Sequence, residues 1–153
     1  MWSLTNHAII NDMETTTALR TVLGLSLART IVVRDVDRPL AAHGLGLSDL
    51  ALLLELLEAS GGRLQRAELA HALGVTPSGI ARQLAPLEKL GIVARESSPR
   101  DARLALVTLT PAGRELAENA ARTAGDAATR VLAGLWSTSE QERLAALVAK
   151  VRA

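Results

Sequence analysis

Four positions between residues 77 and 90 can read the edges of DNA bases or let the backbone approach them closely. These positions are Ser78, Gly79, Arg82 and Gln83. Arginine can bind guanine through two hydrogen bonds, glutamine can pair with adenine, and glycine lets the backbone approach the bases closely. The group therefore predicts contacts with the major groove of double-stranded DNA.

The apolar residues around these positions have the spacing of a helix. Ile80, Leu84 and Leu87 recur at intervals of four and three, so they form a stripe that is buried against the domain core, and the polar positions face outward. Pro86 predicts a kink or a local unwinding, because a proline inside a helix removes one hydrogen bond and clashes with the preceding turn.

A shorter helix precedes this reading helix and completes a helix-turn-helix. It fits Gln65–Leu73 and ends at Gly74, since glycine readily takes the left-handed conformation favoured at helix ends. After the turn, Thr76 can cap the reading helix, and Pro77 suits its first position, where the missing N–H costs nothing. Thr76, at the start of the reading helix, is also a candidate DNA contact.

A charged β-hairpin is predicted directly after the helix-turn-helix. Ile92–Arg95 has the pattern of a strand, Glu96–Arg103 is a polar loop, and Leu104–Leu109 is a second strand. Such a hairpin lies beside the reading helix in a winged domain, so Arg100 and Arg103 can reach phosphates or the minor groove. The alternative is that this polar tip is only a solvated turn.

The order of these motifs resembles the MarR (multiple-antibiotic-resistance regulator) family of bacterial transcription factors. The motifs that carry the resemblance are Leu45–Asp49, Pro86–Gly91, Gly91–Arg95, Asp101–Arg103 and Val107–Gly113. In that family an Asp-x-Arg pair lies in the wing, and a Leu-Thr-x-x-Gly motif follows at the entry to a long dimerisation helix. The resemblance implies that Asp101 contributes to DNA binding indirectly, by holding Arg95 or Arg103 in place.

Apolar helices are predicted on both sides of the winged domain. Residues 13–33 have largely helical apolar spacing, and Arg38-Pro39 closes that segment. Thr110 can cap a helix that runs to Gly134, and Ser137–Glu140 is a capping box for a last helix. The resemblance implies that the terminal helices pair across a twofold axis; the alternative is that they are the packing helices of a monomer.

These elements together predict a mainly α fold with a small β-hairpin wing. We expect a winged helix-turn-helix at residues 41–110, flanked by N- and C-terminal dimerisation helices at residues 1–40 and 111–153. The partners expected of such a protein are a pseudo-palindromic DNA operator and a second copy of the chain.

The charge of the chain is concentrated in the predicted winged domain. The 153 residues carry a net charge of only +1, but Gly61 to Arg103 holds seven basic and four acidic residues. The leucine-rich run Leu50–Leu57 contains Glu55 and is too short to span a membrane, and the N-terminus has no signal-peptide pattern. We therefore expect a cytoplasmic protein without a membrane partner.

Enzymatic activity has little support in the sequence. Cysteine is absent, which excludes thiol nucleophiles and a thiol-oxidation switch. His7, His43 and His71 do not have the spacing of metal ligands, and the chain has neither a phosphate-binding loop nor a dinucleotide-binding motif. We expect no catalytic residue, no metal site and no cofactor.

The resemblance also implies an effector site between the dimerisation helices and the winged lobe. Arg34, His43 and Trp136 lie near that junction in the sequence, and the apolar helices around them favour a small lipophilic or aromatic anion.

Two functions remain open at this point. The first is a homodimeric transcriptional repressor under the control of a small ligand. The second is a winged-helix module that binds another protein and not DNA. A protein-binding module should expose apolar residues on the face of the reading helix, because interface cores favour aromatic residues and methionine. This face is small and polar, so the sequence favours the first function.

Overall fold

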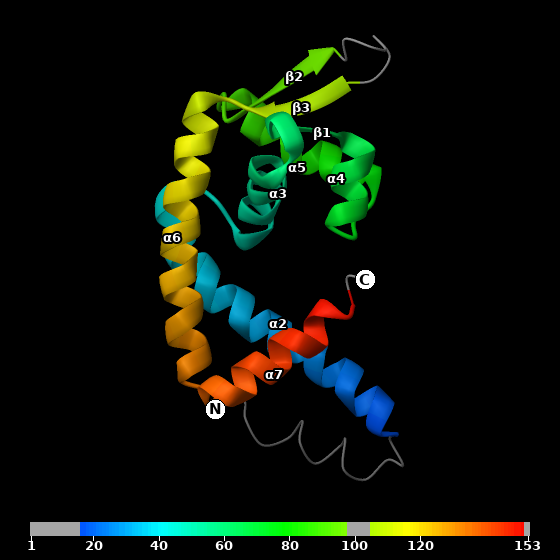
Figure 1. Cartoon of the computed structure of the whole chain (residues 1–153), viewed down its shortest axis with the longest axis vertical. Helices are drawn as coiled ribbons and strands as arrows, with labels where there is room; N and C mark the ends of the chain where they lie inside the picture. Colours follow the sequence, from blue (N-terminus) through cyan, green and yellow to red (C-terminus); the bar gives the residue numbers. More distant parts are fainter. Residues whose placement is uncertain (1–15, 98–104, 152–153) are drawn as a thin grey trace. The chain divides into compact units, whose positions relative to one another are not determined.

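The computed structural model describes residues 16–97 and 105–151, and it confirms a mainly helical chain with a small wing (Figure 1). The chain divides into two compact units, residues 1–34 and residues 35–153. In chain order the elements are α2 (Thr17–Leu40), η1 (Ala41–His43), α3 (Leu47–Glu58), η2 (Ser60–Gly62), β1 (Arg63–Gln65), α4 (Arg66–Ala72), α5 (Pro77–Lys89), β2 (Val93–Ser97), β3 (Ala105–Leu109), α6 (Pro111–Ala133) and α7 (Thr138–Ala149).

The core of the second unit is aliphatic and is centred on α3. This helix packs against α6 on one side and against the sheet and α4 on the other. The buried residues of α3 are Leu50, Leu52, Leu53 and Leu56. Helix α6 contributes alanines at intervals of three and four, namely Ala117, Ala120, Ala124 and Ala127. Each buried leucine stabilises the fold by about 1.5–3 kcal/mol relative to an exposed one, so the Leu-rich run is the centre of the domain.

The wing is a three-stranded antiparallel sheet in the order β1-β3-β2. The predicted hairpin is confirmed, with Val93 opposite Leu109. Its first strand runs further than predicted, because Glu96 and Ser97, expected in the loop, pair with Leu106 and Ala105.

The sequence did not indicate β1, in which Leu64 pairs with Val107. Three residues are too few for polar–apolar alternation to identify a strand, and Gln65, expected to begin the first helix, instead ends β1 and precedes α4. The strand forms here because β3 offers an edge with which it pairs.

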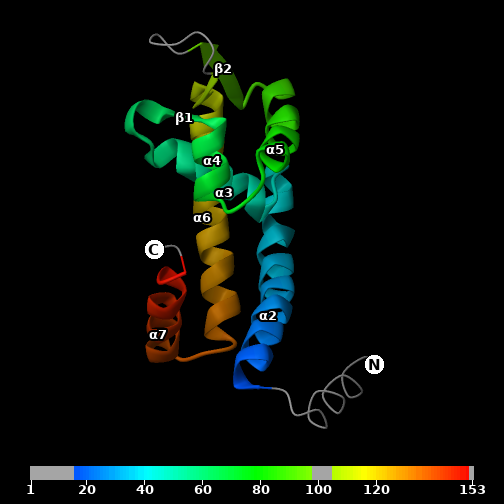
Figure 2. The same ribbon diagram turned by 90° about the vertical axis from the view of Figure 1, so that its right-hand side faces the viewer.

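The two C-terminal helices begin at the capping residues that the sequence predicted. The Thr110 hydroxyl accepts a hydrogen bond from the Gly113 N–H at 3.0 Å and starts α6. The Ser137 N–H and hydroxyl both donate to the Glu140 carboxylate, at 2.9 and 2.6 Å, and start α7. These bonds, led by the one from the hydroxyl, lower the pKa of Glu140 below its ordinary value. Helix α6 begins beside the sheet, and α7 follows at its opposite end (Figures 1 and 2).

Helix α2 begins at Thr17 and ends at Leu40, one residue beyond the proline that was expected to close it. Its exposed large apolar side chains are Leu19, Val22, Leu23, Leu25, Leu27 and Ile31. Among the residues that the structure describes, no single helix combines the length and the apolar composition needed to cross a membrane.

The unwinding expected at Pro86 is wrong, because α5 continues as one helix through this residue to Lys89. Pro86 is exposed in the last turns of the helix, where water can hydrate the carbonyl group that loses its partner. The Leu90 N–H still donates to the Pro86 carbonyl at 3.1 Å. The helix is therefore continuous through Pro86, and the alternative expectation of a kink there stays a prediction.

Candidate nucleic-acid interface

The turn between α4 and α5 is fixed by hydrogen bonds within the chain. Gly74 lies in the left-handed region of backbone conformation, with a φ of 63°. Its N–H donates to the His71 carbonyl at 3.1 Å, and the Val75 N–H donates to the Ala70 carbonyl at 3.0 Å. These two bonds satisfy carbonyl groups at the end of α4. The predicted end of the first helix is thus confirmed.

The start of α5 is held by Thr76, as predicted. Its hydroxyl accepts a hydrogen bond from the Gly79 N–H at 3.1 Å, and Pro77 follows at the first helical position. A Cβ atom at position 79 would lie 3.3 Å from the Thr76 hydroxyl. The small residue therefore keeps the cap in place and leaves the backbone accessible at the beginning of the helix.

The two faces of α5 are divided largely as the sequence predicted. Ile80, Leu84 and Leu87 are buried. Ser78 and Arg82 are exposed, and Gly79 is half-buried. The outward face therefore presents one hydroxyl, one guanidinium and a stretch of backbone.

Gln83 departs from the expectation that its side chain faces outward. It is half-buried, and its Nε2 donates to Asp49 Oδ1 of α3 at 3.4 Å. The other oxygen of Asp49 accepts from the Gly46 N–H at 3.0 Å, at the start of α3. Position 83 borders the buried stripe, so its amide lies within reach of α3 and is drawn toward that carboxylate.

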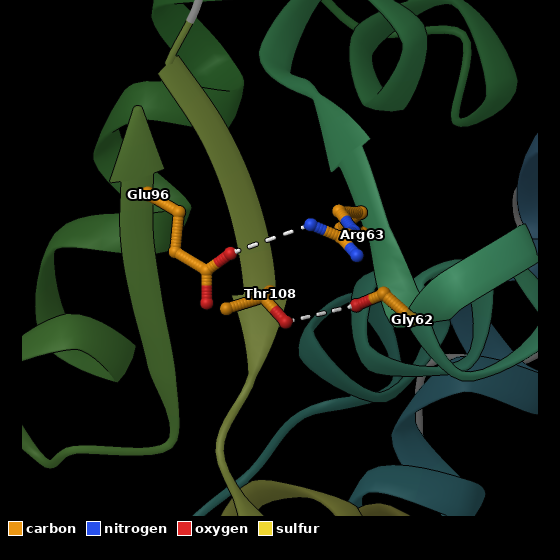
Figure 3. A network of polar contacts seen from close by, with 4 residues as sticks. All are labelled: Gly62, Arg63, Glu96 and Thr108. Atoms are coloured by element: carbon orange, nitrogen blue, oxygen red, sulfur yellow. Dashed lines mark hydrogen bonds and ion pairs between the residues drawn. The ribbon is translucent and has the colours of Figure 1, made fainter. Parts of the chain in front are cut away.

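The base of the wing holds two arginines that pair with acidic side chains. Arg95 on β2 donates from Nε to Glu88 Oε1 on α5 at 2.5 Å. Arg63 on β1 reaches across β3 toward Glu96 on β2 at 3.8 Å, beside the bond from the Thr108 hydroxyl to the Gly62 carbonyl (Figure 3). The strands are therefore tied to one another and to α5.

Three predicted DNA contacts at the wing tip lie outside the described residues. They are Arg100, Asp101 and Arg103. The suggested partner of Asp101 was Arg95 or Arg103, and Arg95 has Glu88 as a partner.

The three candidate effector residues lie in different parts of the structure. His43 Nε2 lies 2.9 Å from the Thr123 hydroxyl, against the middle of α6. Trp136 follows the end of α6 and lines a hollow of about 280 Å³ with residues of α7. Arg34 is exposed and belongs to the first unit. The structure therefore does not join His43 and Trp136 in one pocket.

A hollow that the sequence did not indicate lies between the end of α2 and α6. Its volume is about 400 Å³, and its lining residues are Asp35, Arg38, Pro39, Ala127, Arg130 and Val131. The lining therefore combines two arginines and an aspartate with apolar side chains, and the Arg38 guanidinium lies 3.9 Å from the Asp35 carboxylate. The arginines are far apart in the sequence, so only the packing of the end of α2 on α6 reveals the site. Within residues 16–97 and 105–151, no three histidine or acidic side chains could hold a metal ion.

Comparison with known proteins agrees with this geometry. A model of the MarR family matches residues 43–104. The uncharacterized HTH-type transcriptional regulator YdgJ of Bacillus subtilis is 30% identical over 112 residues, which span 73% of this chain and 66% of the relative. The chain thus aligns with just under two thirds of that protein's length.

Solved structures extend the likeness over most of the chain. Sco3205, a MarR family transcriptional regulator from Streptomyces coelicolor solved in complex with DNA, is 29% identical with a TM-score of 0.77. The alignment covers 92% of this chain and 89% of Sco3205. A variant of E. coli MarR complexed with operator DNA has a TM-score of 0.80 at 21% identity, covering 92% of this chain and 99% of that one, and shows the shared fold.

Both YdgJ and Sco3205 are described as transcriptional regulators. The helix-turn-helix, the wing and the long helix α6 occur in the order that the sequence predicted. On the combined evidence of these elements and relatives, this chain belongs to the MarR family of winged-helix transcriptional regulators.

Proposed function

We propose that the protein is a homodimeric repressor that binds a pseudo-palindromic DNA operator and releases it when a small ligand binds. The observation that carries this proposal is the outward face of α5. Ser78 and Arg82 are exposed there, and the capped helix start leaves the backbone near Gly79 accessible. This is the chemistry of a major-groove reader.

Within this proposal the residues divide the work of recognition. Arg82 reads a base, and Thr76, Ser78 and Gly79 bring the start of α5 close to the groove. Gln83 contributes a base contact only when its amide leaves Asp49. The wing residues Arg100 and Arg103 contact phosphates, with Asp101 holding the wing arginine. Two relatives, Sco3205 and E. coli MarR, have been solved with DNA, which supports this arrangement.

The alternative, a module that binds a protein, finds less support at this face. The large apolar side chains exposed near α5 are Val75, before the helix, and Leu90, after it. Both lie outside the helix itself, which runs from Pro77 to Lys89. A protein interface would be expected to have an apolar centre, so we favour DNA.

The proposed dimer rests on apolar surface at both ends of the chain. On α7 and after it, Leu147, Val148 and Val151 are exposed, and on α2 the side chains of Val22 and Leu27 are 62% and 63% exposed. Monomeric proteins rarely leave large contiguous apolar patches in water. Helices α2, α6 and α7, within the proposed dimerisation segments 1–40 and 111–153, are suited to pair with a second copy.

We expect a dimer at micromolar concentration and an operator with half-site centres about 10 bp apart. Replacing Leu147 with glutamate should shift the mass measured by light scattering toward the monomer, because a charge would enter the interface. Leu90→Glu is the matched control, since Leu90 is exposed at the end of α5, outside the proposed interface. A monomeric wild-type protein, or footprinting that protects one asymmetric half-site, would contradict the proposal.

The proposed effector is a lipophilic or aromatic carboxylate. The hollow between the end of α2 and α6 supports this choice, because Arg130 can bind a carboxylate while Ala127 and Val131 contact an apolar body. Arg38 can join Arg130 when its guanidinium turns from Asp35, which lines the same hollow. Arg34, His43 and Trp136 are not among the lining residues of the hollow, and their role in ligand binding stays a separate prediction. Such a ligand can release DNA only if it prefers one spacing of the two reading helices over the other.

A thermal-shift screen of aromatic acids should find compounds that stabilise the protein and release its operator. Arg130→Gln should weaken that response about tenfold or more, because it removes a charge-assisted bond to the carboxylate. Arg122→Gln is the control, since Arg122 is exposed on α6 outside the hollow. The chain has no cysteine, so thiol oxidants should not release DNA. Release by mild oxidation, with no response to any acid, would contradict ligand control.

A further inference from the structure

We propose that Glu88 is a positioning residue, which sets the direction of the wing relative to the recognition helix α5 by holding Arg95. The inference rests on the proposed DNA-binding function. It assigns a role to an acidic residue at a surface where negative charge should otherwise weaken binding.

The bond between Glu88 and Arg95 joins the end of α5 to β2 across a short turn. Glu88 lies in the last turn of α5, and Arg95 lies on β2, seven residues later. Between them the chain turns at Gly91, where φ is 67°. The Gly91 N–H donates to the Glu88 carbonyl at 3.0 Å, and the Ile92 N–H donates to the Leu87 carbonyl at 2.9 Å.

These backbone bonds hold the turn itself, and the side-chain bond holds the strand beyond it. Arg95 Nε lies 2.5 Å from Glu88 Oε1, so β2 is attached to α5 a second time, beyond the turn. A guanidinium donates in fixed directions, so the bond restricts orientation as well as distance. Because β2 pairs with β3 along its length, the constraint extends to both strands of the hairpin.

The second ion pair of the wing offers a contrast. Arg63 and Glu96 are 3.8 Å apart, with side chains 45% and 50% exposed. Glu88 is only 24% exposed, and Arg95 is 47% exposed. Water and salt screen the Arg63–Glu96 pair more strongly, and exposed pairs of that kind contribute little. Glu88 and Glu96 therefore carry the same charge near the same surface. They differ because the Glu88–Arg95 pair fixes β2 against α5, whereas the more exposed Glu96–Arg63 pair contributes little.

This difference separates a positioning role from a simple effect of charge. Removing either carboxylate should reduce repulsion of the DNA phosphates and raise affinity for any duplex. Only removal of Glu88 should also let the wing change its direction relative to α5. Misplacement of the wing would then weaken binding to the operator more than binding to unrelated DNA, because only the operator complex has a fixed geometry.

The experiment compares Glu88→Ala, Glu88→Gln and Glu96→Ala in the full chain. Affinity is measured over a series of salt concentrations for a duplex that the wild type selects from random DNA and for a shuffled duplex of equal length. We expect the ratio of the two affinities to fall about tenfold in Glu88→Ala and to stay unchanged in Glu96→Ala. Glu88→Gln should restore part of the ratio, because its amide oxygen can still accept from Arg95.

Thermal unfolding of each variant shows whether the protein remains folded. If Glu88→Ala is unfolded at the assay temperature, the comparison uses Glu88→Gln instead. Its ratio of affinity for the selected duplex to affinity for the shuffled duplex should then lie below that of the wild type. Equal ratios in the wild type and all variants, or an equal fall in the Glu88 and Glu96 variants, would overturn the positioning role. A wild type that selects no duplex would instead overturn the proposed function, on which this inference rests.

Discussion

Replacing Gly113 with alanine is expected to lower the free energy of unfolding by about 1–3 kcal/mol or more. Gly113 is buried in the first turn of α6, against the junction between α5 and the wing. A Cβ atom there would lie 1.9 Å from the carbonyl oxygen of Ile92 and 2.9 Å from its carbonyl carbon. Both are backbone atoms, so no side-chain rotation can relieve the overlap.

Accommodating that methyl group would require α6 to move away from the junction. The Ile92 carbonyl accepts a hydrogen bond from the Thr110 N–H at 3.1 Å, and the Thr110 hydroxyl lies 2.7 Å from the Gly91 carbonyl. A shift of α6 would lengthen these bonds as well. The substitution should therefore disturb the attachment of α6 to the recognition helix, in addition to the packing.

Gly125→Ala in the same helix is the matched control. A methyl group added at that position would have no atom of a described neighbour within 4 Å, and alanine favours a helix over glycine by about 1 kcal/mol. Denaturant unfolding at equal protein concentration should show loss of stability for Gly113→Ala and none for Gly125→Ala. Equal denaturation midpoints for the two variants would contradict this prediction, because they would show that the contact between Gly113 and Ile92 can accommodate a methyl group.

Replacing Arg82 with alanine should weaken operator binding by roughly 1–3 kcal/mol, about 5- to 150-fold. Arg82 is exposed on the outward face of α5, in the turn that follows its capped start. A guanidinium at this place can bind guanine through two hydrogen bonds, and alanine can make neither. The variant should also lose its base preference at one position of each half-site.

Lys89→Ala provides the control for charge. Lys89 is exposed at the far end of the same helix, so its removal also takes one positive charge from α5. Any loss in this variant should be similar for all sequences, because a phosphate contact carries no base information. Arg82 would not be a base reader if the alanine variant selected the same sequences as the wild type with the same affinity.

The sequence by itself determined the features that depend on neighbouring residues. Thr76 and Thr110 each cap a helix through a bond to an N–H three residues later, and Gly74 and Gly91 each follow the end of one. Such interactions form within one turn of the chain, so residue type and spacing are sufficient to predict them. The buried stripe of α5 follows from helical periodicity in the same way. These local signals, in order, predicted the helix-turn-helix and the wing.

Only the tertiary structure decided which distant side chains meet. It directed Gln83 toward Asp49, 34 residues away, and so altered a predicted base contact. It added β1 to the sheet and placed Arg38 and Arg130 around one hollow. Such contacts depend on how helices and strands pack, and many pairings of polar residues are compatible with one sequence pattern. The identities of the residues limit these contacts, but the packing of apolar faces selects among them, because burial provides most of the favourable free energy of the fold.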